Sequence, residues 1–332
     1  MVVKIFGKLQ EAFCTSRAKC RILGLTIGLA ILAIVALPAQ GQTVNWGPSV
    51  QLDDGFAPRV AASGTTIVQV HQGTNGSGPL WYRTAQLGPD GTIQWFGTGS
   101  IEFDSGSAPS VAASGTTAVE VHQGDPGSLW YHSGQIQLDG TIKWSGSIQM
   151  DDGFAPSVAA SGTTIVQVHQ ATNRSGPLWY RTGHIAPDGT IQWFGTGSLP
   201  YDNGFAPSVA IAGPTVVEVH QGDPGTLWYR TGQVQFDGTI KWRGSLRMDD
   251  GFAPSVAASG TTVVQVHQAT NAEGPLWYRT GQLGRNGTIH WNGSGSVNYD
   301  NGFAPSAGTS GPAAVEIHQG DPGTLWSHSG QD

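Results

Sequence analysis

The stretch TVVEVHQGDPGTLWYRTGQVQFDGTIKW, residues 215–242, decides the fold of this chain. Residues 215–221 and 227–233 alternate between apolar and polar side chains, and this period of two places successive side chains on opposite faces of a β-strand. Asp237-Gly238 then precedes a third short run, and an Asx-Gly pair is a strong hairpin signal because both turn residues adopt positive φ. With the run 207–212 upstream, the stretch predicts four antiparallel strands joined by tight turns.

This pattern recurs along the whole chain after the first forty residues. Two tryptophan series account for all 12 tryptophans, and neighbours within each series are 49 residues apart. The first series is Trp81, Trp130, Trp179, Trp228, Trp277 and Trp326, and the second is Trp46, Trp95, Trp144, Trp193, Trp242 and Trp291. Four strands in a repeat of 40 to 50 residues is the pattern of a β-propeller blade. We therefore predict an all-β, six-bladed propeller over residues 42–332.

The ends of the chain indicate how the ring closes. The last repeat stops after its third strand, whereas Thr43–Trp46 aligns with the fourth strand of an earlier repeat, Thr239–Trp242. The N-terminal strand is therefore expected to complete the sixth blade, since closure removes open sheet edges. The loop after the His-Gln dipeptide alternates in length, which makes a larger unit of 98 residues, present three times.

Residues 1–41 differ from the repeats and indicate a secretory signal peptide. A basic segment precedes a 16-residue apolar run, Ile22–Leu37, and a small-residue site, Ala39-Gln40-Gly41. A spanning helix needs about 20 apolar residues, so cleavage is favoured over a membrane anchor, which stays open as the alternative. The protein is thus expected to be secreted.

The composition limits the chemistry of the mature chain. Both cysteines, Cys14 and Cys20, lie in the leader, so the mature protein has no disulfide, zinc–thiolate site or cysteine nucleophile. Without the leader, 11 Lys and Arg face 22 Asp and Glu, a net charge of −11. An acidic chain without a basic cluster is a poor candidate for binding nucleic acid or anionic membranes.

A histidine recurs in every repeat, and we assign it a structural role. Strand alternation places it on one face with the residue two positions earlier, which is Glu in even repeats and Gln in odd ones. A buried imidazole must be hydrogen-bonded, which favours a register-holding role over a ligand contact or a pH-sensitive site. The six are His71, His122, His169, His220, His267 and His318.

The candidate ligand-binding residues combine an aromatic ring with polar partners. In Leu227-Trp228-Tyr229-Arg230 the Trp and Arg share a face, so a sugar could stack on the indole while the guanidinium meets its hydroxyls. The alternative is core packing, in which Arg covers the indole edge. In the second and sixth repeats His132 and His328 replace Arg. The candidates are Trp81, Arg83, Glu120, Trp130, Trp179, Arg181, Glu218, Trp228, Arg230, Trp277, Arg279 and Glu316.

An Asp-x-Gly motif, such as Asp151-Asp152-Gly153, recurs in every connection between repeats. A calcium site would need more oxygen ligands than two carboxylates supply, so an Asx turn is favoured. No metal or cofactor is therefore expected.

The chain resembles the six-bladed β-propeller lectins of fungi and bacteria, among them fucose-binding forms in which two-blade chains assemble into one ring. The resemblance lies in the six blades, the two-blade unit and the repeated Trp, Arg and Glu. It implies sugar binding in clefts between adjacent blades, with Trp81, Arg83, Glu120 and their counterparts as contacts. A weaker resemblance, in Asp237–Trp242, is to the Asp-box turn of sialidase-like propellers and implies only the fold.

These observations favour a secreted, multivalent glycan-binding protein that is a monomeric ring. The alternative is an extracellular protein-interaction or structural propeller without sugar binding. An enzyme is disfavoured, because a catalytic acid could not alternate with an amide as Glu218 does with Gln167 and keep its chemistry.

Overall fold

A computed structural model describes residues 43–223, 225–321 and 323–331, so the expected signal peptide lies outside the described residues. The described residues belong to one compact unit of the chain, residues 40–332. They form antiparallel strands throughout, as predicted. None of them lies in a helix with the length and apolar character needed to cross a bilayer.

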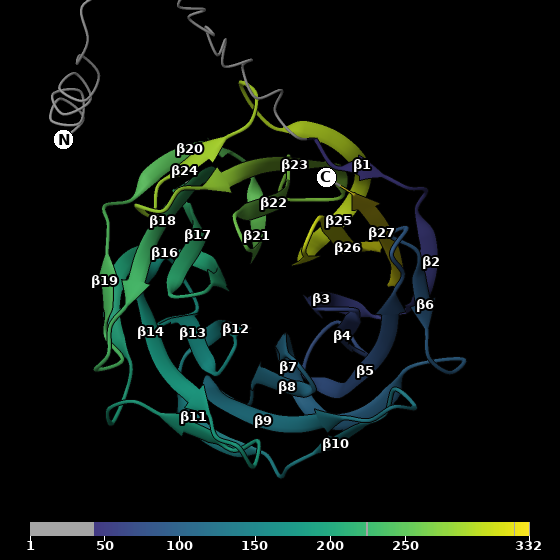
Figure 1. The fold of residues 1–332 in the computed structure, drawn as a ribbon, viewed down its shortest axis with the longest axis horizontal. Helices are drawn as coiled ribbons and strands as arrows, with labels where there is room; N and C mark the ends of the chain where they lie inside the picture. Colours follow the sequence, from purple (N-terminus) through teal and green to yellow (C-terminus); the bar gives the residue numbers. More distant parts are fainter. Residues whose placement is uncertain (1–42, 224, 322, 332) are drawn as a thin grey trace, which may run out of the picture. The chain divides into compact units, whose positions relative to one another are not determined.

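The strands form three sheets of nine strands each (Figure 1). The first contains β3 (Phe56–Ser63), β4 (Thr66–Gln72), β5 (Gly78–Leu87), β6 (Ile93–Trp95), β7 (Ile101–Ser114), β8 (Thr117–Gln123), β9 (Ser128–Ile136), β10 (Ile142–Trp144) and β11 (Ile148–Asp152). The second contains β12 (Phe154–Ser161), β13 (Thr164–Gln170), β14 (Gly176–Ile185), β15 (Ile191–Trp193), β16 (Leu199–Ala212), β17 (Thr215–Gly222), β18 (Thr226–Val234), β19 (Ile240–Trp242) and β20 (Leu246–Asp250). The third contains β21 (Phe252–Ser259), β22 (Thr262–Gln268), β23 (Gly274–Leu283), β24 (Ile289–Trp291), β25 (Val297–Ser310), β26 (Ala313–Gly320), β27 (Thr324–Gln331), β1 (Asn45–Trp46) and β2 (Val50–Asp54).

Each sheet consists of two repeats joined by one long strand. The first half of β16 pairs with β14 and its second half pairs with β17. We number the repeats as units 1 to 6. Unit 1 is β3–β6, unit 3 is β12–β15 and unit 5 is β21–β24. Unit 2 is the second half of β7 with β8–β10, and unit 4 is the second half of β16 with β17–β19. Unit 6 is the second half of β25 with β26, β27 and β1. This pairing of repeats matches the 98-residue period of the sequence.

The outer edge of each unit is made of two short strand pieces, whereas the sequence predicts a single fourth strand. In unit 3 it consists of β15, which pairs with the end of β14, and the first half of β16, which pairs with the start of β14. A Gly-Thr-Gly loop, residues 195–197, separates the two pieces, and Gly195 has a φ of 66°. Gly195 lets the backbone turn at this break, where a residue with a Cβ would be strained.

The Asx-Gly hairpins also differ from the expected geometry. In unit 4 the Gly238 N–H donates to the Gln235 carbonyl, and Gly238 has a φ of 82°. Among the described non-glycine residues positive φ is confined to six alanines, so Asp237 is not left-handed. The turn is a three-residue loop with a glycine bulge, and the Asp237 carboxylate accepts the Thr239 N–H at 2.9 Å instead.

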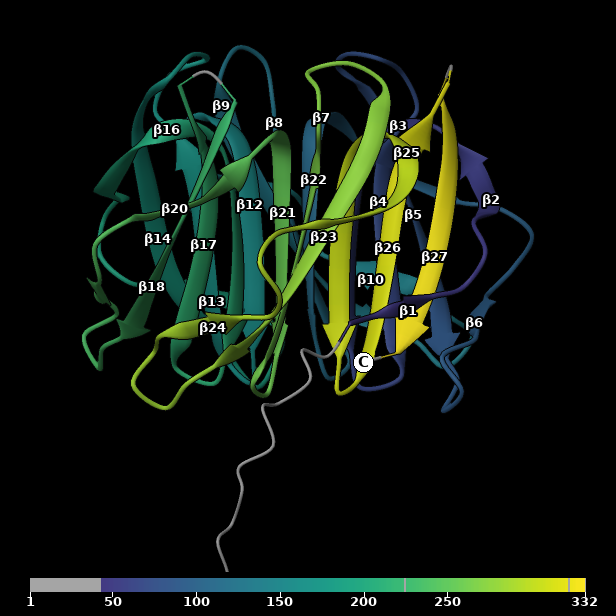
Figure 2. The same cartoon turned by 90° about the horizontal axis from the view of Figure 1, so that it is seen from above.

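The two ends of the described chain pair with each other, as the sequence predicts. Asn45 and Trp46 of β1 lie opposite Gln331 and Gly330 of β27, and β2 pairs with the other end of β27 (Figure 2). The N-terminal strand therefore completes unit 6.

The hydrophobic core lies between units. Each of six buried clusters takes residues from two consecutive units, for example Val166 and Val168 of unit 3 with Val209 and Val216 of unit 4. The last cluster combines Val315 of unit 6 with residues of unit 1, so the packing runs around the whole circle seen in Figure 1. Burying each such side chain stabilises the fold by about 1.5–3 kcal/mol, as an upper estimate.

A narrow channel follows the axis of this circle. It is lined by three residues from each of six inner strands, in the ranges 60–62, 111–113, 158–160, 209–211, 256–258 and 307–309. These residues are almost all Val, Ile or Ala, so the channel is small and apolar.

A hydrogen bond accepted by the glutamine of each His-Gln dipeptide joins consecutive units. The Ala206 N–H of unit 4 donates to the side-chain oxygen of Gln170 in unit 3 at 2.7 Å, and Ala206 has a φ of 48°. Such a φ is unusual for a residue with a Cβ, so the bond holds a strained bulge in place. The equivalent bond between sheets, from Ala253 to Gln221, is longer at 3.3 Å.

We predict that Gln170→Ala lowers the free energy of unfolding by about 1–3 kcal/mol, because it leaves the Ala206 N–H and the carbonyls of Thr172 and Arg174 without their partner. Gln221→Ala is the matched control, since both glutamines are 6% exposed but the Gln221 bond is longer. Urea unfolding curves measure both values. Equal losses, or a smaller loss for Gln170→Ala, would refute the role assigned to the Gln170 side chain.

Candidate functional site

Three clefts lie at equivalent places, where an odd unit meets the following even unit. The largest has a volume of about 340 Å³ and is lined by Tyr180, Arg181, Phe194 and Leu199 of one unit and by the Asp237-Gly238-Thr239 turn of the next. The equivalent clefts contain Arg83 with the turn 139–141, and Arg279 with Thr43, and measure about 100 and 150 Å³. Ligand pockets are typically about 300–1,000 Å³, so the Arg181 cleft is the best formed.

The arginine of each cleft is fixed on a tryptophan of its own unit. The Arg181 guanidinium lies 5.6 Å from the ring centroid of Trp193, and it donates to the Met150 carbonyl at 2.8 Å and the Gly195 carbonyl at 3.4 Å. A guanidinium has five N–H donors, so donors remain for a ligand. Arg83, Arg181 and Arg279 form no ion pair with a carboxylate among the described residues, which leaves their charges available.

An aromatic ring stands beside two of the clefts. Phe194 lines the Arg181 cleft and is 36% exposed, and Phe96 is its counterpart in the Arg83 cleft. Asn292 occupies this position in the third cleft. Sequence reasoning missed these residues, although each directly follows a tryptophan of the second series.

The tryptophans of the first series lie elsewhere. Trp228 is half-buried, its indole N–H donates to the Thr226 hydroxyl at 3.2 Å, and a Cβ on Gly222 would lie 2.7 Å from that nitrogen. The indole therefore covers the glycine loop after the His-Gln dipeptide. None of Trp81, Trp130, Trp179, Trp228 or Trp277 lines the three clefts.

The predicted glutamates are wholly buried. Glu120, Glu218 and Glu316 have no exposed surface, so none of them can touch a ligand in this structure. Instead, each accepts a hydrogen bond from the histidine two residues later, at 3.0 to 3.1 Å. The grouping of Glu with Trp and Arg in one sugar site is therefore corrected: the structure brings only the odd-unit arginines to the clefts.

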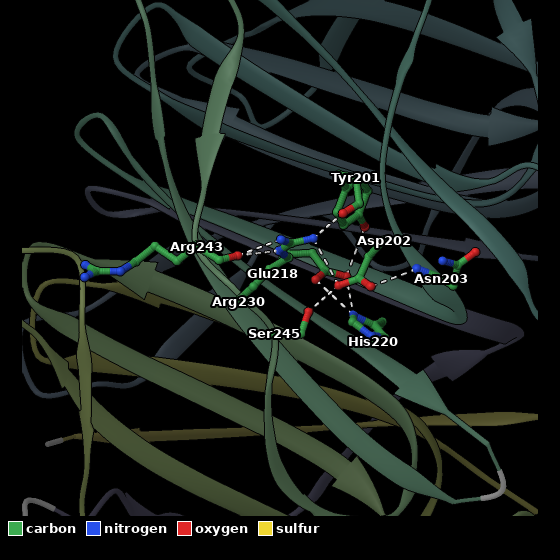
Figure 3. A network of polar contacts seen from close by, with 8 residues as sticks. All are labelled: Tyr201, Asp202, Asn203, Glu218, His220, Arg230, Arg243 and Ser245. Atoms are coloured by element: carbon green, nitrogen blue, oxygen red, sulfur yellow. Dashed lines mark hydrogen bonds and ion pairs between the residues drawn. The ribbon is translucent and has the colours of Figure 1, made fainter.

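Arg230 of unit 4 has a different environment from its odd-unit counterparts. It forms an ion pair with Asp202 at 3.0 Å and donates to the carbonyls of Tyr201 and Arg243 (Figure 3). The Tyr201 hydroxyl donates to Glu218 at 3.0 Å. Asp202 pairs with Leu178 of unit 3, so the network joins two units.

The six repeated histidines are buried at 2% exposure and hydrogen-bonded, as a structural role requires. Their partner is the Gln or Glu two residues earlier on the same strand, as in His169 with Gln167 at 3.2 Å, rather than a neighbouring unit or turn. In units 2 and 6 the described residues also bring two imidazoles and a carboxylate together, Asp104–His122–His132 and Asp300–His318–His328.

The Gln or Glu two positions before each histidine sets the direction of the histidine's pKa shift. Burial lowers the pKa of His71 to about 4, against the opposing charge of Asp53, and it lowers the pKa values of His169 and His267 to about 4 as well. Burial also acts to lower the pKa of His220, but the charge and hydrogen bond of Glu218 outweigh it and raise the value. Odd units thus hold neutral histidines.

The Asp-x-Gly motif forms a side-chain turn. The Asp151 carboxylate accepts the Asp152 N–H at 2.9 Å, and its other oxygen accepts the Ser198 hydroxyl. This is the predicted turn role.

The fold is similar to that of solved lectin structures. A scan against protein-family models finds no match, and a search of curated proteins finds none either. The Aleuria aurantia lectin, as a point mutant in complex with Fucalpha1-6GlcNAc, is 13% identical over 85% of this chain and 93% of its own, with a TM-score of 0.55. The fucose-specific lectin from Aleuria aurantia, in a mercury-derivative form, is 14% identical over 84% of this chain and 97% of its own, with a TM-score of 0.53. The chain therefore has a β-propeller fold similar to that of these lectins.

We predict that His169→Gln weakens the dependence of stability on pH in the acid range. The folded pKa of His169 lies below the unfolded value of 6.5, so the unfolded state binds the proton first and stability falls as pH falls from 6.5 towards 4. Over that range wild type should lose about 1.4 kcal/mol per pH unit more than the variant. Urea unfolding at several pH values measures the difference, and parallel pH profiles would show that His169 is not held neutral.

Proposed function

We propose that this chain is a secreted, multivalent glycan-binding protein whose six units are the six blades of the propeller and whose binding sites lie between blades. The channel residues support the count, because each of six inner strands contributes equally to its wall. The continuous strands β7, β16 and β25 join blades in pairs without changing this number.

One observation carries the proposal: a guanidinium with spare donors recurs at three clefts between units. Sugar hydroxyls accept hydrogen bonds from such donors, and the Phe194 ring offers an apolar face to the pyranose. The Asp237-Gly238-Thr239 turn, against which the Phe194 ring packs at Gly238, supplies polar groups from the next unit. Three equivalent sites would each be weak, and a multivalent surface would bind more strongly through effective concentration.

A binding role is favoured over catalysis by the residues of the same units. One carboxylate lines the Arg181 cleft, that of Asp237, and it already accepts hydrogen bonds from the Thr239 N–H and hydroxyl. General acid–base catalysis needs a group that is positioned to exchange a proton with the substrate, and an acceptor held within its own turn is poorly placed for this. We therefore propose that the protein is not an enzyme.

Fucose is the first ligand to test, because the two similar structures are a lectin in complex with Fucalpha1-6GlcNAc and a fucose-specific lectin. We predict that the full chain binds immobilised fucosylated glycans on an array. Arg181→Gln should weaken monosaccharide binding at its cleft about tenfold or more, because a hydrogen bond from a charged group contributes about 1.5–3 kcal/mol. Isothermal titration calorimetry with fucose and with the best glycan from the array measures this.

Arg247→Gln is the control for this experiment, because Arg247 is exposed and, of the residues that the structure describes, its side chain pairs with the nearby Asp250 alone. An array without binding to any glycan would refute the proposal and favour the protein-interaction alternative. Equal binding by Arg181→Gln and Arg247→Gln would place the glycan outside the cleft.

A further inference from the structure

Two clusters of polar side chains in units 2 and 6 have the composition of metal sites. We propose that Asp104–His122–His132 and Asp300–His318–His328 each bind a divalent transition-metal ion such as Zn²⁺. In each cluster the three possible ligand atoms lie within 4.8 Å of one another. The proposal does not depend on glycan binding.

The ligand atoms converge on one carboxylate oxygen. His132 Nε2 lies 2.5 Å and His122 Nε2 lies 3.6 Å from Asp104 Oδ2. The twin cluster repeats this, with His328 Nε2 at 2.6 Å and His318 Nε2 at 3.6 Å from Asp300 Oδ2. The four imidazoles are only 2 to 4% exposed. Bulk water therefore does not screen the nitrogens from the carboxylate oxygen.

The other ring nitrogen of each histidine faces a hydrogen-bond acceptor, either a carboxylate or a backbone carbonyl. His122 Nδ1 lies 3.0 Å from Glu120 Oε2, and His132 Nδ1 lies 2.9 Å from the Ser145 carbonyl. In unit 6 the corresponding acceptors are Glu316, at 3.0 Å, and the Gly47 carbonyl, at 2.9 Å. A neutral imidazole must therefore carry its hydrogen on Nδ1, and its Nε2 presents a lone pair to the carboxylate.

This arrangement is the one that orients metal-binding histidines. A ligating histidine usually donates its second N–H to a carboxylate or a backbone carbonyl, which fixes the tautomer. Without a cation, two lone pairs and a carboxylate oxygen would repel one another at these distances. The geometry thus calls for a positive charge between them.

Unit 4 shows the same site with its cation built in. There Arg230 occupies the position of His132 and His328, and its guanidinium lies 3.0 Å from Asp202. Glu218, like Glu120 and Glu316, is fully buried beside it. Units 2 and 6 lack this fixed charge, and buried oxygens of Glu120 and Glu316 have no hydrogen-bond partner among the described residues.

The ligand set selects the kind of ion. Two imidazoles and one carboxylate, with a position left for water, suit Zn²⁺ and its neighbours in the transition series, whereas Ca²⁺ and Mg²⁺ prefer oxygen ligands. Bond lengths of about 2.0–2.1 Å put tetrahedral ligand atoms about 3.3 Å apart, so His132 would move slightly away from Asp104. The Asp104 side chain is 25% exposed, which gives an ion a route from solvent.

The ion would join parts of the chain that belong to different units. Asp104 lies opposite Leu80 of unit 1, whereas His122 and His132 belong to unit 2. In the twin site His328 also holds Gly47, between β1 and β2, so this ion would strengthen the closure of the ring.

The test is the number of Zn²⁺ ions bound by the full chain, produced without a histidine tag. Calorimetric titration with ZnCl₂, and metal analysis after dialysis, should give two more ions per chain for wild type than for His132→Arg/His328→Arg. His132→Arg alone should lose one ion. The double variant keeps Cys14 and Cys20, so the zinc that it still binds measures any zinc bound by the leader.

Arg230→His provides the complementary gain of function, since it should give unit 4 the same ligands and raise the number of ions by one. Zn²⁺ should also raise the Tm of wild type more than that of the double variant, whereas CaCl₂ should raise neither. The arginine variants copy the residue found in units 1, 3, 4 and 5, and circular dichroism checks their fold. Equal zinc binding by wild type and the double variant would overturn the proposal and leave a proton as the cation.

Discussion

The structure depends on burying the apolar faces between neighbouring units. Within the described part of the chain, each hydrophobic cluster takes residues from two consecutive units, as Val119 and Ile165 do across units 2 and 3, so none of these units has a core of its own. A strand face buried in this way must be covered at every junction, and only a closed circle covers all of them. Closure in turn explains why β1 pairs with β27 and why Val315 packs beside Val60.

The same constraint decides where the polar side chains of each repeat can be. Packing the units buries one histidine and one Gln or Glu in each, and buried polar groups must find partners. Gln leaves a neutral pair, whereas Glu218 adds a charge that Arg230 and the Tyr201 hydroxyl help to compensate. The alternation of Gln and Glu therefore separates two kinds of junction: odd units leave their arginines at open clefts, and even units use the same position for internal charge balance.

Much of the fold could be predicted from the sequence, because the 49-residue spacing and strand alternation report on burial directly. The pairing of Trp46 with Gly330 followed from a missing strand at one end and an extra one at the other. The break at residues 195–197 and the glycine bulge at Gly238 could not be predicted in the same way, since both depend on how a strand bends around its neighbours.

The candidate site was less predictable. Strand alternation assigned Arg181 to a face correctly, but Trp193, rather than Trp179, lies beneath it. That contact joins β14 to β15, the strand that the Asx-Gly hairpin predicts, but it depends on the register that sets Gly183 opposite Trp193, which the repeat pattern alone does not give. The replacement of Arg by His132 and His328 was visible in the sequence, but its meaning required the position of Asp104 and Asp300.

The central claim is that closing the ring creates ligand sites between units, with Arg181 as the main contact in the best-formed cleft. The most direct measurement is a crystal structure of the protein with its preferred glycan bound. The account predicts a sugar ring between the Arg181 guanidinium and the Asp237-Gly238-Thr239 turn, with equivalent density at Arg83 or Arg279. Density for the sugar over Trp228 or on a face remote from these junctions, with no sugar in the three clefts, would contradict the account.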